Sequence, residues 1–266
     1  MSSVLFLFLT HLGIGIAATL PIVGSAAGAQ FFRFNSGLAA GLMLVGLAFR
    51  PMPSPVTDLE SVGFAALVVS TGTLLVYWAS IGRGLVSLRP WLLMTTILAG
   101  GLSMVSQAIG LSAGEMAPSA ALTSVSFLSS AALLGGTCTA MILGHWYLVL
   151  PSMDVSLLQS MVKFHIGSTV VRIVVVMAVL GVALVSWQAP SGAGYGQYVL
   201  SLDGVFLWQR VLFGLVSPAL LSYLTWETAK IRATQSATGI LYVDFFTVVV
   251  GEVLAKYLLL STRVPL

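Results

Sequence analysis

Eight long runs of apolar residues, separated by short breakers, follow one another along this chain. A helix needs roughly 20 residues to cross the ~30 Å hydrocarbon core of a bilayer. Lipid offers no hydrogen-bond partner to a peptide group, so runs that cross it must be helical. We therefore predict an all-α, polytopic integral membrane bundle of about eight transmembrane helices that forms a single domain over residues 1–266. The expected spans are 3–24, 35–50, 62–82, 91–110, 119–150, 155–187, 205–228 and 238–260.

The composition excludes a soluble fold. Hydrophobic residues make up 58% of the 266 residues and charged residues only 7%, whereas a soluble domain carries about a quarter charged residues. The net charge of +3 arises from scattered single residues, so the lipid bilayer is the expected partner and nucleic acid is not. A lone cysteine, Cys138, rules out a disulfide framework and a cysteine-based metal site.

The first apolar run is predicted to be a retained span, because no basic segment precedes it and it is about twice as long as the core of a signal peptide. Lys and Arg residues in the connections set the orientation of the bundle. Connections after the odd-numbered spans hold five of these residues and the opposite side holds three. We therefore expect a multi-pass protein of the cell inner membrane with both termini outside. The five are Arg33, Arg83, Arg89, Lys230 and Arg232, and the three are Arg50, Arg210 and Arg263.

Ionisable residues inside predicted spans are the main candidates for function, because a charge at mid-bilayer costs about 3 to above 10 kcal/mol. Glu252 and Lys256 are spaced i,i+4 on the last span and are predicted to neutralise each other. Arg172 and Asp244 are further candidates for a polar path. Small residues at four-residue spacing, such as Gly37 with Gly41, predict places where helices approach closely.

Two of the three histidines are predicted to lie at the same depth. Counting the rise of ~1.5 Å per residue from the 151–154 turn places His165 ~16 Å deep, and His11 lies ~12 Å below the other surface. Two imidazoles at matching depth on different helices suit the metal of a b-type haem. Arg172, seven residues after His165, lies on the same face and would meet the propionates. The alternative is that each histidine hydrogen-bonds to a neighbouring helix.

His145, Trp146 and Tyr147 follow one another near the inner end of the fifth span. A histidine can donate to a quinone carbonyl while aromatic rings pack on the quinone, so this tripeptide is a candidate contact for a quinone or a lipid headgroup. The alternative is a plain interfacial anchor. A short interfacial re-entry is expected within the Gly-rich stretch 189–198.

These features predict an integral membrane subunit of a respiratory or redox complex that passes electrons between quinone and a partner, with haem b as a candidate carrier. Its expected partners are other membrane or peripheral redox subunits. One alternative is a transporter or channel whose polar path is lined by Arg172, Asp244, Glu252 and Lys256, and another is a non-catalytic structural or assembly subunit. The stretch GEVLAKYL at 251–258 resembles the quinol-interacting anchor subunits of bacterial molybdopterin oxidoreductases over this one helix, and no residue role is transferred from it.

Overall fold

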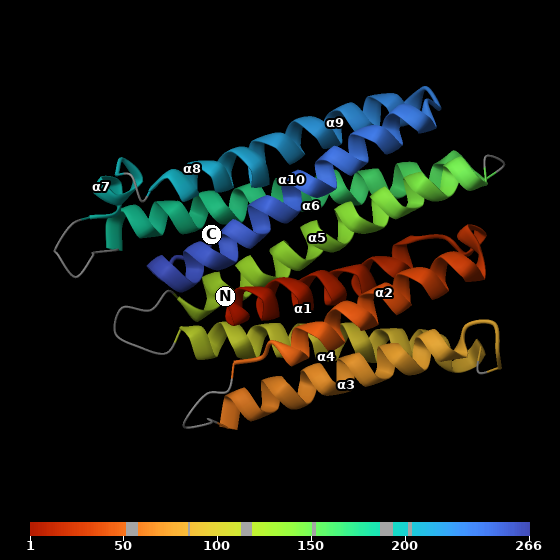
Figure 1. Cartoon of the computed structure of the whole chain (residues 1–266), viewed down its shortest axis with the longest axis horizontal. Coiled ribbons are helices and arrows are strands. Elements are labelled where there is room, and N and C mark those ends of the chain that lie inside the picture. Colours follow the sequence, from red (N-terminus) through yellow and green to blue (C-terminus); the bar gives the residue numbers. More distant parts are fainter. Residues whose placement is uncertain (52–57, 85, 113–118, 151–152, 187–193, 202–203) are drawn as a thin grey trace.

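The computed structural model describes residues 1–51, 58–84, 86–112, 119–150, 153–186, 194–201 and 204–266, and these residues are almost entirely helical. The long helices lie side by side along one axis, and each connection reverses the direction of the chain (Figure 1). The α-helices are α1 (Ser2–Thr19), α2 (Gly28–Ala48), α3 (Asp58–Ser80), α4 (Arg89–Leu111), α5 (Ala120–Val149), α6 (Val155–Ser186), α7 (Tyr195–Val199), α8 (Val205–Val211), α9 (Ser217–Lys230) and α10 (Thr234–Thr262). A π-helical turn, Leu212–Val216, joins α8 to α9, and short 3₁₀ turns occupy Leu20–Ile22, Ser25–Ala27 and Val86–Leu88.

Helices α1 and α5 form the centre of the bundle. Helices α2, α3 and α4 flank them on one side, and α6, α9 and α10 flank them on the other (Figure 1). Both chain termini lie toward the end of the bundle that also holds α7, which we call the terminal end. The opposite end carries the connections α1–α2, α3–α4, α5–α6 and α9–α10, and we call it the hairpin end.

Seven helical segments are long and apolar enough to cross a membrane, and they coincide with the first seven predicted spans. The protein is therefore a multi-pass membrane bundle, as predicted. Helix α2 begins at Gly28 rather than near residue 35, so it is longer than expected and includes Arg33. The eighth predicted span forms α10, which is not among the seven. It nevertheless runs alongside the other long helices (Figure 1) and buries Asp244, Glu252 and Lys256.

Glycine and proline set several of the helix ends. Gly82 adopts φ +79° in the turn after α3, a backbone conformation that a side chain makes unfavourable. Pro90 occupies the first turn of α4, where its missing N–H would have no partner. The predicted re-entry falls largely on 189–193, outside the described residues. Directly after it, Tyr195 begins the short helix α7 and is fully buried.

The distribution of polar and apolar side chains in this bundle suits a lipid environment. Large apolar side chains such as Val174 and Met177 on α6 are more than half exposed on its outer surface. The inner face of the same helix carries His165 and Arg172, and both side chains are completely buried. Lipid solvates the apolar exterior, whereas each buried polar group must find its partners inside the protein.

A very close crossing joins α1 to α5 at Gly15 and Gly135. A Cβ atom on Gly15 would lie 2.0 Å from the carbonyl oxygen of Ala131, and one on Gly135 would lie 2.1 Å from the carbonyl carbon of Gly15. Both contacts are to backbone, so neither can be relieved by a side-chain rotation. Such close crossings require glycine on both helices.

Gly15→Ala is therefore expected to force the two central helices apart. Overpacking typically lowers the free energy of unfolding by about 1–3 kcal/mol. The matched control is Gly181→Ala on the outer face of α6, where a Cβ would meet nothing within 4 Å. Thermal unfolding in detergent should show a clear loss for Gly15→Ala and Gly135→Ala and none for Gly181→Ala. Equal melting temperatures for all three variants would contradict this crossing.

Candidate functional site

Polar side chains gather where α5, α6 and α10 meet, and they form two layers. Each of these helices contributes one residue to each layer, with a spacing of seven or eight residues. Two turns of helix return a side chain to the same face ~10–12 Å further along the axis. The layers are therefore stacked along one interface inside the bundle. The cluster layer holds Ser130, Arg172 and Glu252, and the histidine layer holds Thr137, His165 and Asp244.

Glu252 is the centre of the cluster layer. Its Oε1 accepts hydrogen bonds from Arg172 Nε at 2.9 Å and Arg210 Nη2 at 2.8 Å. Its Oε2 accepts from Arg172 Nη2 at 3.1 Å and Ser130 Oγ at 2.5 Å, and it lies 3.5 Å from Lys256 Nζ. One carboxylate thus contacts three cationic side chains, all of them 2% exposed or less. The predicted Glu252–Lys256 pair is present, but it is part of a larger network.

Arg172 ties several parts of the chain together. Its Nη1 donates to the backbone oxygen and the hydroxyl of Ser126 and to Ser129 Oγ, at 2.9–3.2 Å. Its Nη2 also donates to the main-chain oxygen of Leu266 at 2.8 Å. Arginine presents five N–H donors in a planar fork, and here the fork bridges α6, α5, α10 and the last residue. Haem propionates would have to displace these partners.

Arg210 enters the cluster through a gap made by two glycines. A Cβ on Gly214 would lie 1.7 Å from Arg210 Nη1, and one on Gly251 would lie 2.2 Å from Gly214 Cα. The gap falls in the π-helical turn, which frequently marks a functional position in a helix. Arg210 is fully buried, and its Nε and Nη1 have no hydrogen-bond partner. It was expected in a connection, and this assignment is wrong.

The described side chains of this cluster carry more positive than negative charge. Arg172, Arg210 and Lys256 supply three cationic groups against the single carboxylate of Glu252. Arginine does not release its proton in proteins, whereas a buried lysine can. Lys256 also donates to Ser130 Oγ at 2.6 Å, and the neutral amine can keep this bond. Lys256 is therefore the group whose deprotonation would relieve the excess charge.

The histidine layer contains a close contact between an imidazole and a carboxyl group. His165 Nε2 lies 2.6 Å from Asp244 Oδ2, and His165 Nδ1 lies 3.0 Å from Thr137 Oγ1. Thr137 already donates its single hydroxyl proton to the Leu133 carbonyl at 2.8 Å. The Thr137 hydroxyl oxygen can then accept a hydrogen bond from His165 Nδ1, while His165 Nε2 faces the Asp244 carboxyl group.

The structure does not bring His11 and His165 together. His11 packs edge-on against Phe127 with ring centroids 4.6 Å apart, whereas His165 contacts Thr137. Phe127 and Thr137 are ten residues apart on α5, so the two imidazoles differ by ~15 Å along the bundle. The prediction of equal depth is wrong. His11 lies instead beside the cluster layer, fully buried, with no hydrogen-bond partner on either ring nitrogen.

The tripeptide His145–Trp146–Tyr147 does not form one site. His145 is exposed, and its Nδ1 lies 2.9 Å from the hydroxyl of Tyr242. Trp146 packs edge-on against Phe31, and Tyr147 is buried and donates to the Asp154 carbonyl. Successive helical residues point about 100° apart, so three neighbours face three directions.

The α5–α6 connection holds one described acidic group outside the spans. The backbone N–H of Ser156 donates to Asp154 Oδ1 at 3.0 Å at the start of α6. This backbone hydrogen bond lowers the pKa of Asp154. The predicted cation Lys163 lies 5.3 Å from the centroid of the Trp226 ring at the same end of the bundle. These groups are separate from the two polar layers.

No family model and no curated protein matches this sequence, so no residue role is transferred by similarity. Among the described residues, no group of three or more His, Cys, Asp or Glu side chains is placed to hold a metal ion. The site therefore consists of the two polar layers with His11 beside them. Arg210 and the serines of α5 belong to it and were not predicted. Gly214 follows Arg210 by four residues, and this spacing is the one sequence signal that could have indicated the burial of Arg210.

Proposed function

We propose that this protein moves protons through the membrane interior along the α5–α6–α10 interface. This is the transporter alternative, in which Arg172, Asp244, Glu252 and Lys256 line a polar path. The observation that carries the proposal is the stack of two buried acid–base pairs, His165–Asp244 and Glu252–Lys256. Chains of acidic and histidine residues inside membranes are typical of proton relays.

A purely structural role explains this polar interior less well. Breaking water contacts of a charged group costs several kcal/mol per ion, and a buried ion pair is often no more stabilising than well-packed apolar residues. Six ionisable side chains in a lipid-facing bundle would therefore be an inefficient way to hold helices together. All six are 2% exposed or less. They are His165, Arg172, Arg210, Asp244, Glu252 and Lys256.

Hydroxyl groups occupy the space between the two layers. Ser168 and Thr169 on α6 follow His165, and both donate to its carbonyl oxygen. Thr247 on α10 follows Asp244 and donates to the Asp244 carbonyl at 2.8 Å. Each of these hydroxyl oxygens keeps a lone pair that can accept a further proton donor. Asp244 Oδ1 has no partner and can serve as the point where a proton enters or leaves.

A redox function is the second candidate, because quinone reduction also requires proton delivery. In that case the same two layers would supply protons, and haem b, quinone and partner redox subunits remain predictions. Ligation of iron by His165 would require release of Thr137 or Asp244 from its ring nitrogens. The orientation is also part of this proposal, with both termini outside the inner membrane. Arg210 lies within α8 and Arg33 within α2, so each side loses one cation and the bias becomes four against two.

Asp244→Asn is expected to block proton movement, because an amide cannot take up or release a proton at the contact with His165. The protein is reconstituted into liposomes, a potassium diffusion potential is imposed, and internal pH is followed with a dye. We expect at least a tenfold lower rate for Asp244→Asn. The matched carboxylate-to-amide control is Glu227→Gln, whose partner Lys230 lies in an exposed pair on α9. Equal rates for wild type, Asp244→Asn and empty liposomes would refute the proposal.

A further inference from the structure

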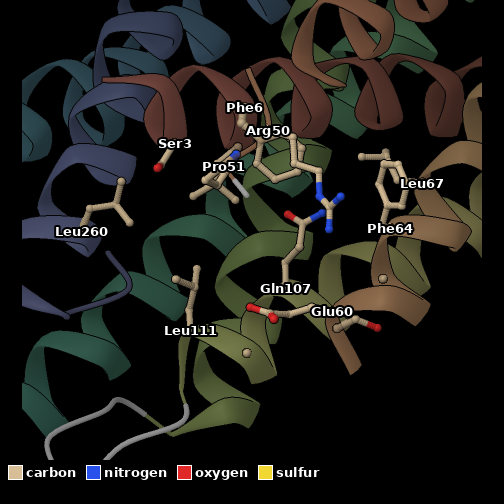
Figure 2. Close-up of a pocket in the computed structure, with 14 residues that line it drawn as sticks. Ser3, Phe6, Arg50, Pro51, Glu60, Phe64, Leu67, Gln107, Leu111 and Leu260 are labelled. Carbon is tan, nitrogen blue, oxygen red and sulfur yellow. The ribbon is translucent and has the colours of Figure 1, made fainter. Parts of the chain in front are cut away.

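A pocket lies at the terminal end of the bundle, outside both polar layers. Its volume is about 230 Å³, and it is lined by α1, α3, α4, two residues that follow α2 and one residue of α10. In Figure 2, Arg50 and Gln107 reach from opposite sides toward the middle of the ring of lining residues. The pocket thus lies between helices that are far apart in sequence.

The size and walls of the pocket fit one flat ring system. Phe6, Leu7, Leu67 and Leu111 provide apolar walls on three different helices. Pockets for drug-sized ligands typically have volumes of about 300–1,000 Å³. The smaller volume here accommodates a ring with small substituents and not a whole phospholipid.

The polar groups of the pocket favour an uncharged ligand. Arg50 lies with its guanidinium carbon 3.9 Å from the centroid of the Phe64 ring, and Glu60 lines the same pocket. One cationic and one anionic side chain leave no net charge for an ion to neutralise. Arg50 offers N–H donors, and the buried Gln107 Oε1 has no hydrogen-bond partner. The pocket therefore combines donors for a carbonyl oxygen with an acceptor for a hydroxyl group.

We propose that this pocket binds the headgroup of a quinone and its quinol. A quinone presents carbonyl oxygens on a neutral ring, and the quinol presents hydroxyl groups at the same positions. Arg50 is the donor toward the first form and Gln107 Oε1 is the acceptor toward the second. This site differs from the predicted contact at His145, which lies at the opposite end of the bundle and pairs with Tyr242.

The pocket adjoins the cluster layer. Leu7 lies one helical turn from His11 on α1, and Leu260 lies one turn from Lys256 on α10, so the layer begins ~6 Å further into the bundle. A quinol bound here would be next to buried groups that exchange protons. Quinone binding at this pocket does not depend on the proposed proton movement, and the two are tested by different measurements.

Photolabelling tests the proposal directly. Purified protein is illuminated with an azido-benzoquinone that carries a short alkyl chain, and the labelled peptides are mapped by mass spectrometry. Excess decylbenzoquinone or excess short-chain phosphatidylglycerol serves as competitor. Gly110→Leu fills the pocket, because a Cβ there meets only Glu60 Cγ at 3.9 Å. Gly101→Leu is the control on the same helix, where a Cβ would meet nothing within 4 Å.

We expect labelling of α3 and α4 peptides around Phe64 and Gln107 that decylbenzoquinone suppresses and phosphatidylglycerol does not. Gly110→Leu and Arg50→Gln should each lower this labelling at least tenfold, and Gly101→Leu should leave it unchanged. Because Arg50→Gln adds no bulk, it tests the site even where Gly110→Leu lowers the yield of folded protein. Labelling confined to the His145 region, labelling that Arg50→Gln does not lower, or protection by the phospholipid alone would overturn the proposal.

Discussion

Replacing Glu252 with Gln is expected to cause the largest loss of stability of any single carboxylate substitution in this chain. The amide removes the only described side-chain anion that contacts Arg172, Arg210 and Lys256. Removing one partner of a buried ion pair typically lowers the free energy of unfolding by about 3–5 kcal/mol, because the remaining charge is left uncompensated. Here three cations are affected at once. We expect most of Glu252→Gln to aggregate or to elute as unfolded protein in size-exclusion chromatography.

The double variant Glu252→Gln/Lys256→Met separates a simple ion pair from a network. An isolated i,i+4 pair would predict a double variant almost as stable as the wild type. The structure predicts only partial recovery, because Arg172 and Arg210 still lose their carboxylate. Unfolding midpoints in a denaturing detergent provide the measurement. Full recovery in the double variant would show that the arginines do not depend on Glu252.

The architecture could be predicted because lipid strongly restricts the backbone conformations that can cross it. Apolar runs of sufficient length have no stable alternative to helices in a bilayer, and seven predicted runs are membrane-compatible helices in the structure. The start of α2 was misplaced because Arg33 looked like a connection. In the structure α2 begins earlier, at Gly28, and includes Arg33. The guanidinium carbon of Arg33 lies 5.6 Å from the centroid of the Trp78 ring, which accommodates the charge.

Depths could not be predicted from spacing alone. His165 was counted inward from the 151–154 turn as though the turn marked the membrane surface. Helices α5 and α6 have 30 and 32 residues, which correspond to ~45–48 Å and exceed a ~30 Å hydrocarbon core. If the turn lies beyond the core, His165 lies less deep below the membrane surface than the count indicated. His11 lies in the middle of α1 (Ser2–Thr19), beside the cluster layer.

The candidate residues were found more reliably than their partners. Burial of a charge in an apolar run singled out Arg172, Asp244, Glu252 and Lys256, because each must be compensated inside the bundle. Which of them meet depends on helix neighbours, and a single sequence does not encode these visibly. The close approach of α1 to α5 shows the same limit, since it joins Gly15 to Gly135 across 120 residues, whereas a Cβ added to Gly41 of the predicted motif would meet nothing within 4 Å.

Arg172→Lys is expected to destabilise the protein nearly as much as removal of Glu252, although it preserves the charge. Arg172 donates to both oxygens of Glu252, to Ser126, to Ser129 and to the main-chain oxygen of Leu266. A lysine has three donors on a flexible stem and cannot reproduce this planar fork. Several acceptors would lose their partner in a low-dielectric interior, and each buried unsatisfied polar group costs about 1–3 kcal/mol.

Arg83→Lys is the matched control, because Arg83 is exposed and makes a single hydrogen bond, 3.4 Å long, to the Ala79 carbonyl. We expect its unfolding midpoint to equal that of the wild type, while Arg172→Lys loses folded protein. The comparison distinguishes a requirement for the planar guanidinium of Arg172 from a requirement for any positive charge at this position. If Arg172→Lys unfolds like Arg83→Lys, the cluster requires only a positive charge at this position, and the fork does not organise α5, α6 and α10.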